Sequence, residues 1–415
     1  MKPPSHQKNT NQKNTKKPPP KRPVPSFPPA WLWLVDEAIP NWVKKQYSPR
    51  ESWKDKPFGS MDAQFFFKGI QELSDLFTED RPKGMPAYFL HPKYRSGYLL
   101  YFLPLQAAKM ISLFRLHPGA PEAAVQHGKK TGVIRIADVG AGPGTASIAF
   151  LLWLLGRKLE MGEVLPEIEL NWFDTNATTM EDGQALVELL ASHFPRLRGK
   201  VKINTYVTPI WKAASILKDE QSLIFLAHVL NEAPITKDAT LAQSFTGIIE
   251  KMSGGGMLLI EPAARRPAQM LSHLRDQLIE EQWIDPSGAS IWGPCLHAGR
   301  CPLGEGRDWC HFSVPVEVPG EYFKIFSRNL SSERQWLKFS YIWIASKAYP
   351  APVAASQMRR VVSDPLSANK ETASSVLLCE PEQPYRYRVS GNAPIRRGDV
   401  IKKIPAGPLS GSSRH

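Results

Sequence analysis

The sequence lacks any long uncharged apolar run. No stretch of about 18 or more apolar residues is free of charge, so we expect no membrane-spanning helix. Residues 1–28 contain no apolar segment, which argues against a secretory signal peptide. No motif recurs at a fixed period, which argues against a repeat architecture. The class of protein that remains is an ordinary globular chain of two or three domains.

Acidic residues are scarce relative to basic ones. The 415 residues include 39 Asp and Glu against 52 Lys and Arg, for a net charge of +13. RNA, DNA or an anionic membrane surface would suit such a chain as a partner. Residues 1–28 hold seven of the basic residues, none of the acidic ones and many Pro, Asn and Gln. We expect a disordered tail that contacts phosphate, with a purely solubilising tail as the alternative.

Cysteine is also scarce, and all four cysteines lie in the last third of the chain. Their spacing is C-x5-C-x8-C followed by one distant residue. Four thiolates complete the ligand set of one zinc ion or one cubane iron–sulfur cluster. The absence of a C-x2-C pair favours the cluster, although zinc with His297 or His311 stays open. The histidines alternatively donate hydrogen bonds to sulfur. Two disulfides would need an oxidising compartment, which nothing else supports. The candidate ligands are Cys295, Cys301, Cys310 and Cys379.

The chain divides by pattern into five segments. Apolar residues recur at helical spacing in 29–35, 63–77 and 98–116, and Pro104 is expected to end or kink the last helix. The expected segments are a basic tail (1–28), a helical region (29–125), a Rossmann-like core (126–285), a cysteine loop with C-terminal strands (286–405) and a frayed end (406–415).

Strands and helices alternate through the core, which predicts a doubly wound, mainly parallel α/β sheet. The expected strands are 133–139, 168–174, 201–206, 222–228 and 255–261, and the expected helices are 147–155, 180–190 and 241–252. Residues 336–345 and 375–389 have the pattern of longer strands, which we expect to form a closing antiparallel pair. Residues 347–373 between them read as a loop.

A glycine-rich turn follows the first strand of the core. Asp138 ends that strand, and Gly140, Gly142 and Gly144 follow in G-x-G-x-G spacing before a helix. Glycines let the backbone approach a ligand, and a helix N-terminus offers free N–H groups. This motif resembles the first motif of class I S-adenosylmethionine methyltransferases. Asp174 ends the second strand, where a carboxylate can accept hydrogen bonds from ribose hydroxyls. The alternative is a structural turn with Asp174 as a helix N-cap.

The segment after the fourth core strand is the expected acceptor site. Asn231 and Pro234 occupy places where amino-methylating enzymes hold the target nitrogen, but a second proline and an aromatic residue are missing. Asn231 and Glu232 therefore either orient a substrate or cap a helix. His228 is more typical of a core histidine than of a base.

These motifs together resemble one family. Cys301-Pro302-Leu303 and Trp309-Cys310-His311-Phe312 match the cysteine cluster of the Rsm22 (methyltransferase-like 17) family. Cys295-Leu296-His297 keeps the histidine but has Leu where proline is common. The stretches Val229–Glu232 and Arg396–Asp399 are also similar to the family. The resemblance runs from about residue 85 to 400.

The resemblance implies a class I methyltransferase sheet that carries a C-terminal cysteine-cluster insertion. It also implies S-adenosylmethionine, a [4Fe-4S] cluster on the four cysteines, and association with the small ribosomal subunit near its rRNA. Members occur in bacteria and mitochondria. We expect a ribosome-associated protein of a bacterial cytoplasm, with the mitochondrial matrix as the alternative.

Two functions remain open for such a protein. It is either an rRNA methyltransferase or a non-catalytic ribosome assembly factor, and the motifs alone do not decide between the two. A radical enzyme is disfavoured, because radical enzymes use three closely spaced cysteines to leave one iron open, and this chain has four cysteines and a Rossmann-like loop.

Overall fold

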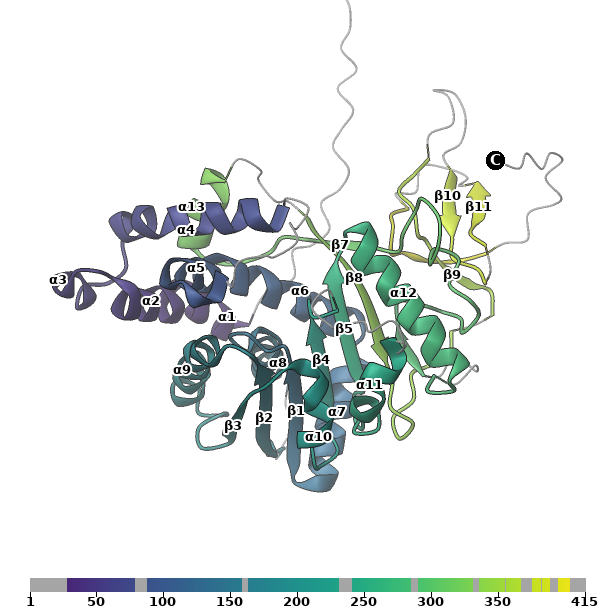
Figure 1. Cartoon of the computed structure of the whole chain (residues 1–415), viewed down its shortest axis with the longest axis horizontal. Helices are drawn as coiled ribbons and strands as arrows, with labels where there is room; N and C mark the ends of the chain where they lie inside the picture. Colours follow the sequence, from purple (N-terminus) through teal and green to yellow (C-terminus); the bar gives the residue numbers. More distant parts are fainter. Residues whose placement is uncertain are drawn as a thin grey trace, which may run out of the picture.

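The structure is a computed structural model of the chain. The central sheet lies between a group of N-terminal helices and a small C-terminal group of short strands (Figure 1). The structure describes residues 28–78, 88–158, 163–230, 241–284, 290–330, 336–354, 356–366, 375–381, 383–388 and 395–403.

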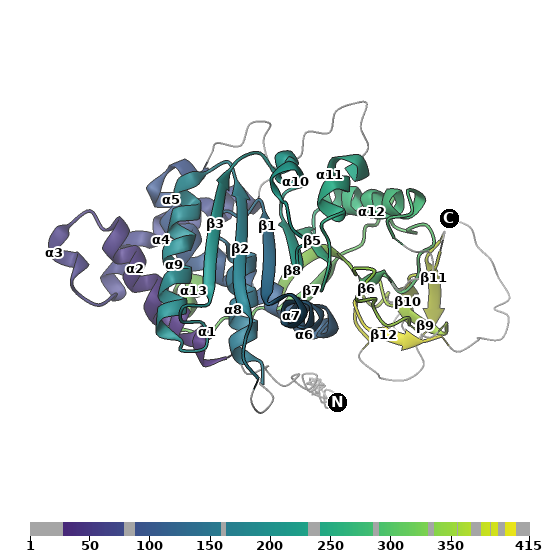
Figure 2. The same ribbon diagram turned by 90° about the horizontal axis from the view of Figure 1, so that it is seen from below.

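Eight strands form the central sheet in the order β3-β2-β1-β4-β5-β8-β6, and β7 pairs with β8. Strands β1 to β5 run parallel, whereas β8 runs antiparallel to β5, β6 and β7. Figure 2 shows β3, β2 and β1 side by side. The strands are β1 (Val133–Val139), β2 (Glu167–Asp174), β3 (Val201–Val207), β4 (Leu223–Ala227), β5 (Met257–Pro262), β6 (Ile291–Gly293), β7 (Phe312–Pro315) and β8 (Trp336–Ile344). The predicted doubly wound, mainly parallel sheet is confirmed.

Strand β4 is apolar throughout because helices cover both faces of the sheet. Successive side chains of a strand point to opposite faces. In β4, Leu223 and Phe225 enter one buried cluster, and Ile224 and Leu226 enter the other. A continuous apolar run is therefore what this position requires.

The first face of the sheet shares one core with the N-terminal helices. The N-terminal helices are α1 (Pro29–Trp33), η1 (Leu34–Ala38), α2 (Ile39–Tyr47), α3 (Glu51–Lys54), α4 (Ser60–Thr78), η2 (Tyr88–Leu90), α5 (Pro92–Gly97), η3 (Tyr98–Phe102), α6 (Leu103–Leu116) and α7 (Gly119–Thr131). Three helices from later in the chain enter the same core: α8 (Thr145–Gly156), α9 (Ala177–His193) and α13 (Glu321–Asn329). The second face is covered by η4 (Ile210–Lys212), α10 (Ala213–Ile216), α11 (Leu241–Ile249) and α12 (Arg265–Glu280). The helical region is confirmed, whereas its treatment as a separate segment stays a prediction.

The expected break at Pro104 is wrong. Helices α5, η3 and α6 form one stretch, Pro92–Leu116, which is long and apolar enough to cross a membrane by composition alone. Pro104 is the second residue of α6 and follows a π-helical turn, which accommodates its missing N–H. Within the apolar window of this stretch, 78% is buried inside the protein. Burial in the core accounts for its apolar character.

The expected antiparallel pair of 336–345 and 375–389 is also wrong. Residues 375–389 contain two short strands, β10 (Ser375–Leu378) and β11 (Tyr385–Arg388), which pair with each other. Prolines Pro381 and Pro384 fall between them, and proline cannot donate to a strand ladder. The expected loop 347–373 contains β9 (Met358–Arg360), which pairs with β12 (Val400–Lys402). These four strands are called the C-terminal unit below.

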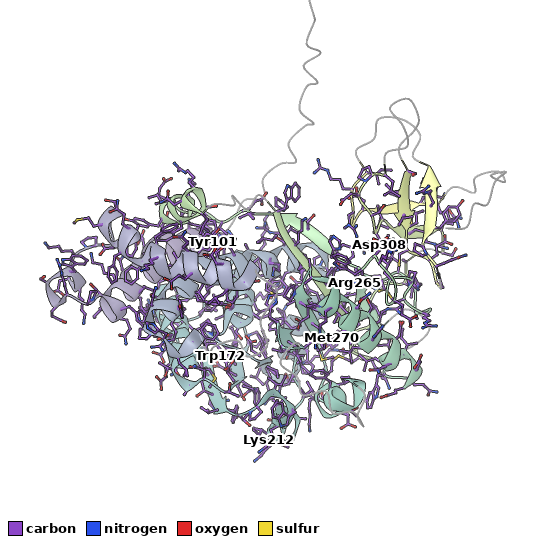
Figure 3. The ribbon with its side chains drawn as sticks, turned by 45° about the horizontal axis from the view of Figure 1, so that its top comes forward. Tyr101, Trp172, Lys212, Arg265, Met270 and Asp308 are labelled. Carbon is purple, nitrogen blue, oxygen red and sulfur yellow. The ribbon has the colours of Figure 1, made fainter. Side chains whose placement is uncertain are left out.

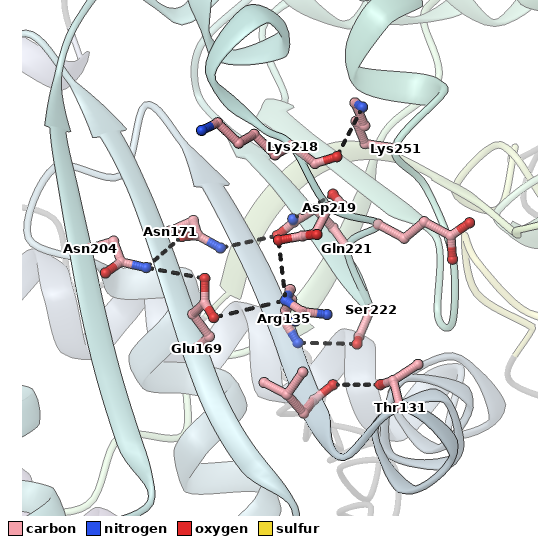
Figure 4. A network of polar contacts seen from close by, with 12 residues as sticks. Thr131, Arg135, Glu169, Asn171, Asn204, Lys218, Asp219, Gln221, Ser222 and Lys251 are labelled. Atoms are coloured by element: carbon pink, nitrogen blue, oxygen red, sulfur yellow. Dashed lines mark hydrogen bonds and ion pairs between the residues drawn. The ribbon is translucent and has the colours of Figure 1, made fainter.

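A ladder of polar side chains crosses strands β3, β2 and β1 (Figure 4). Asn204 donates to the side-chain oxygens of Asn171 and Glu169 at 2.9 and 3.1 Å, and Asn171 donates to Gln221 at 3.3 Å. The Arg135 guanidinium lies 3.8 Å from the Glu169 carboxylate. The side chains of Asn204, Asn171 and Glu169 are hydrogen-bonded within this ladder, so they stabilise the sheet, and the ligand site is to be sought elsewhere.

Candidate functional site

The glycine-rich turn joins β1 to α8 in a conformation that only glycine adopts easily. The φ angles of Gly140, Gly142 and Gly144 are 75°, 51° and 67°. A Cβ atom at Gly140 would come within 2.1 Å of Val229, and one at Gly144 within 2.1 Å of Trp172. At Gly142 the nearest atoms lie 3.7 Å away. The turn is therefore packed tightly at both ends, and its middle is buried in ordinary van der Waals contact with Phe89.

Asp174 faces the middle of this turn from the end of β2. Its Oδ2 accepts a hydrogen bond from the Gly142 N–H at 2.8 Å, and its Oδ1 accepts one from the Asn176 N–H at 2.9 Å. Burial raises the pKa of this carboxyl, whereas the backbone donors lower it. The N-cap of α9 is Asn176, whose side chain accepts from the Thr179 N–H. The alternative that Asp174 caps the helix is therefore wrong.

Asp138 is buried behind the glycine-rich turn and stabilises it through hydrogen bonds. Its side chain is only 1% exposed, and it accepts hydrogen bonds from the N–H and hydroxyl of Ser147 at 3.1 and 2.8 Å. The Ser147 hydroxyl in turn accepts from the Trp172 indole at 2.9 Å. Asp138 thus ties the end of β1 to the first turns of α8. A direct contact between Asp138 and a cofactor stays a prediction.

Burial raises the pKa of Asp138 to about 7, above its ordinary value of 3.8. Between these values the folded chain binds a proton that the unfolded chain does not, so this group lowers the free energy of unfolding as pH rises. Asparagine does not titrate, so we expect the Asp138→Asn variant to lack this loss. Between pH 5 and pH 8 its free energy of unfolding should therefore rise relative to that of the native chain. Thermal unfolding at both pH values checks this, with the exposed Asp219→Asn as control. Equal changes in both variants would contradict it.

The predicted acceptor residues Asn231, Glu232 and Pro234 lie outside the described residues. The described part of the same segment places His228 directly after β4 with a φ of 64°. Such a conformation is strained for a residue other than glycine, and strained residues gather at functional sites. His228 is half-buried and stands among polar groups, which departs from the expected core histidine.

Two residues of α6 complete this polar cluster. The Nε2 atom of His228 lies 3.1 Å from Oε1 of Gln106 and 3.3 Å from Nζ of Lys109. Lys109 is 4% exposed. At the end of β5, buried Glu261 accepts a hydrogen bond from the Leu230 N–H at 2.9 Å. Sequence reasoning missed these residues, although a lysine and a glutamate on apolar elements were a usable signal.

The four cysteines converge between α12, β8 and the C-terminal unit. Cys295 follows β6, Cys310 precedes β7 and Cys379 follows β10, while Cys301 lies in the loop that also carries Asp308 (Figure 3). All four are free thiols. Three of them line one small cavity, whose walls are Ala268, Leu271, Ser272, Arg275, Pro294, Cys295, Cys301, Cys310, Ser340, Tyr341 and Ile342.

The thiols are close enough to influence one another. Burial raises the pKa of Cys301, Cys310 and Cys379, and the neighbouring cysteines raise it further. Among the described residues, no three Cys, His, Asp or Glu side chains are arranged tightly enough to hold a metal ion. Cys295, Cys301 and Cys310 therefore line the cavity, and Cys379 lies close enough for Cys295 and Cys301 to raise its pKa.

Buried arginines stand beside this cavity. The Arg275 guanidinium donates to the His297 carbonyl at 2.6 Å, and its Nε atom has no hydrogen-bond partner in the described part of the chain. Burial lowers the pKa of Arg275, but Cys295, Asp276 and Cys301 outweigh that effect and raise it. Such a donor set, four thiols beside a buried cation, suits an anionic metal–thiolate group.

The two neighbouring histidines differ in their surroundings. The Nε2 atom of His297 lies 3.3 Å from the sulfur of Cys379, and burial lowers the pKa of His297 to about 4, so its ring is neutral. The Nδ1 atom of His311 instead lies 3.1 Å from the Trp309 carbonyl. His297 is thus the histidine placed to contact a sulfur ligand.

One known protein family matches the part of the chain that carries both motifs. The model of the family described as mitochondrial small ribosomal subunit Rsm22 matches residues 134–403. The chain belongs to the Rsm22 family. The match spans the glycine turn and all four cysteines, so the predicted resemblance is confirmed. The description of the Rsm22 family supports the mitochondrial alternative, and it gives no support to a bacterial cytoplasm.

The fold of this Rsm22 member is that of class I S-adenosylmethionine methyltransferases, with five parallel strands followed by a reversed strand. Similar solved structures include an rRNA methylase from Streptococcus thermophilus, at 9% identity and a TM-score of 0.27, covering 55% of this chain and 94% of that one. A protein from Listeria monocytogenes described as a class I methyltransferase has 10% identity and a TM-score of 0.34, covering 77% and 82%. No curated protein matches.

Proposed function

We propose that this protein binds S-adenosylmethionine at the Gly140–Gly144 turn and acts as a methyltransferase on the RNA of the small ribosomal subunit. The observation that carries the proposal is the turn itself, with Asp174 held in front of it by the Gly142 N–H at 2.8 Å. The ribosomal part rests on membership of the Rsm22 family.

The residues at this edge of the sheet supply what methyl transfer needs. Asp174 would accept hydrogen bonds from the ribose hydroxyls of the cofactor, and the glycines, which have no Cβ, would let the cofactor approach the backbone of the turn. Transfer from a sulfonium is an in-line displacement, so the protein's task is to position the acceptor and exclude water. His228 and Lys109 are placed for that task, and Asn231 and Glu232 remain proposed acceptor residues.

We further propose that Cys295, Cys301, Cys310 and Cys379 hold a [4Fe-4S] cluster. A single zinc ion draws its sulfurs to about 2.3 Å from one point. Three of these thiols instead line a cavity, which supports a larger group, and the buried Arg275 beside it would offset part of its negative charge. When bound, a cluster with four thiolate ligands supplies structural cross-linking or one-electron chemistry. Zinc is the alternative occupant.

A second candidate function is a non-catalytic assembly factor. The description of the family names a ribosomal subunit and no enzyme, which favours this candidate. It would use the same fold and the same cofactor without turnover. The same description favours the mitochondrial matrix, and a bacterial cytoplasm stays a prediction.

Calorimetric titration with S-adenosylhomocysteine tests the pocket. We expect Asp174→Ala to weaken binding by about 10- to 100-fold, because hydrogen bonds to a charged group contribute about 1.5–3 kcal/mol. The matched control is Asp219→Ala, which removes an exposed carboxylate at the opposite edge of the sheet. Wild-type affinity in Asp174→Ala, or no binding by the native chain, contradicts the proposal.

Transfer of labelled methyl groups separates the two candidate functions. Native protein, small-subunit RNA and labelled S-adenosylmethionine give labelled RNA if the protein is a methyltransferase. Cofactor binding without labelled RNA, tested on both mature and partly assembled subunits, identifies the assembly factor instead.

A further inference from the structure

Positive charge is unevenly distributed along this chain. Residues 29–355 contain 35 basic and 34 acidic residues and are nearly neutral. Residues 356–403 contain nine basic and five acidic residues, and residues 1–28 contain seven basic and no acidic ones. Apart from the tail, the excess of basic over acidic residues therefore lies in the region of the C-terminal unit. A polyanion is expected to bind the folded part of the chain there.

Strand β8 extends beyond its neighbour at one edge of the sheet. Residues 339–344 pair with β5, while 336–338 pair only with β7. Because β8 runs antiparallel to β5, these extra residues project past the C-terminal end of β5. The parallel strands β1 and β5 both end at this edge, so the projection lies on the same edge as the glycine turn.

The projecting residues carry an exposed aromatic and basic surface, which we call the Trp336 patch. Trp336 is 44% exposed, and exposed Lys338 lies on the same side of the strand. The Arg396 guanidinium lies 5.9 Å from the centre of the Trp336 ring. His311 directly precedes β7, whose Ser313 pairs with Lys338, and Arg397 follows Arg396 in the chain. The patch consists of Trp336, Lys338, His311, Arg396 and Arg397, and it joins β8 to the C-terminal unit.

The charges of the patch are partly compensated. The Asp399 carboxylate accepts a hydrogen bond from the Arg396 N–H at 2.8 Å, and burial lowers the pKa of Arg397 whereas the charges of Asp364 and Asp308 raise it. Within the described ranges, no carboxylate forms an ion pair with Lys338 or Arg396. Arg397 lies 4.0 Å from Asp364, but the Asp364 side chain is 80% exposed, so that contact is screened by water. An exposed tryptophan beside these cations presents both a stacking surface and phosphate contacts.

We propose that the Trp336 patch binds an RNA strand and guides it toward the edge of the sheet that carries the glycine turn. The proposal rests on the proposed function, in that RNA is the substrate or partner there. A base stacks on Trp336, and Lys338 and Arg396 contact the phosphates. Neighbouring strands are about 4.8 Å apart, so β8 lies only about 10 Å from β4 across the sheet.

Fluorescence anisotropy with a labelled single-stranded RNA of about 16 nucleotides tests the patch in the full chain at several salt concentrations. We expect Trp336→Ala to weaken binding by about tenfold with no change in salt dependence, and Trp336→Phe to restore most of it. Lys338→Gln with Arg396→Gln is expected to lower the slope of log affinity against log salt by about 1.4, since each contact with a single strand contributes about 0.7.

The matched control is Lys202→Gln with Lys218→Gln, which removes two exposed lysines near the opposite edge of the sheet. All variants keep the basic tail, so its nonspecific binding cancels. Equal losses in patch and control variants, or unchanged binding in Trp336→Ala of native thermal stability, overturn the proposal. Loss of RNA binding in the patch variants with intact S-adenosylhomocysteine binding supports it. If the native chain binds RNA through the patch but does not bind S-adenosylhomocysteine, the proposed function is contradicted and the patch proposal still holds.

Discussion

Replacing Cys301 by serine is expected to remove most of the iron from protein purified without oxygen. The native chain should carry about four irons per chain and absorb broadly near 400 nm, as four-thiolate clusters do. Cys301 lines the cavity with Cys295 and Cys310, and serine is a poor ligand for iron in such a site. Iron and sulfide analysis with an absorption spectrum measures the loss.

The matched control is Ser272→Ala, which changes the wall of the same cavity without removing a sulfur. This variant should keep its iron and its colour. A colourless native protein with one zinc per chain would contradict the cluster, while the four-cysteine site, the glycine turn and the family assignment would remain. Equal iron in the native chain and Cys301→Ser would remove the site itself.

The central sheet was predictable because its signals are local. Each core strand is a short run that is rich in apolar residues or alternates apolar with polar ones, and the structure places β1 to β5 within a few residues of the expected ranges. The C-terminal unit was not predictable, because its strands are three or four residues long and its buried apolar cluster, among the residues that the structure describes, consists of Val361, Val376 and Leu378. Runs that short have no periodicity to read.

The candidate site divides in the same way. The glycine turn and the cysteines are motifs in which chemistry and spacing are visible along the chain. Lys109, Gln106 and Arg275 come from helices far away in sequence and reach the sites only through packing. No spacing relates Gln106 to His228, which is 122 positions later. Their roles follow from topology, which places α6 against the end of β4.

Gly144→Ala is expected to abolish S-adenosylhomocysteine binding and to lower the free energy of unfolding by about 3 kcal/mol. The φ of 67° at Gly144 costs an L-residue about 1–2 kcal/mol. The added methyl would also come within 2.1 Å of Trp172, and relieving such overpacking costs about 1–3 kcal/mol more. Because Trp172 is fully buried, the turn must move and the cofactor loses its backbone contacts.

Gly199→Ala separates the two causes. Gly199 has a φ of 70° and no atom within 4 Å of its would-be Cβ, so alanine there introduces the backbone strain without the clash. This control should lose about 1 kcal/mol of stability and bind S-adenosylhomocysteine like the native chain. Chemical denaturation and calorimetry on both variants measure the difference. If Gly144→Ala folds and binds with native affinity, the turn is not the cofactor pocket, because no ligand in contact with it would tolerate that displacement.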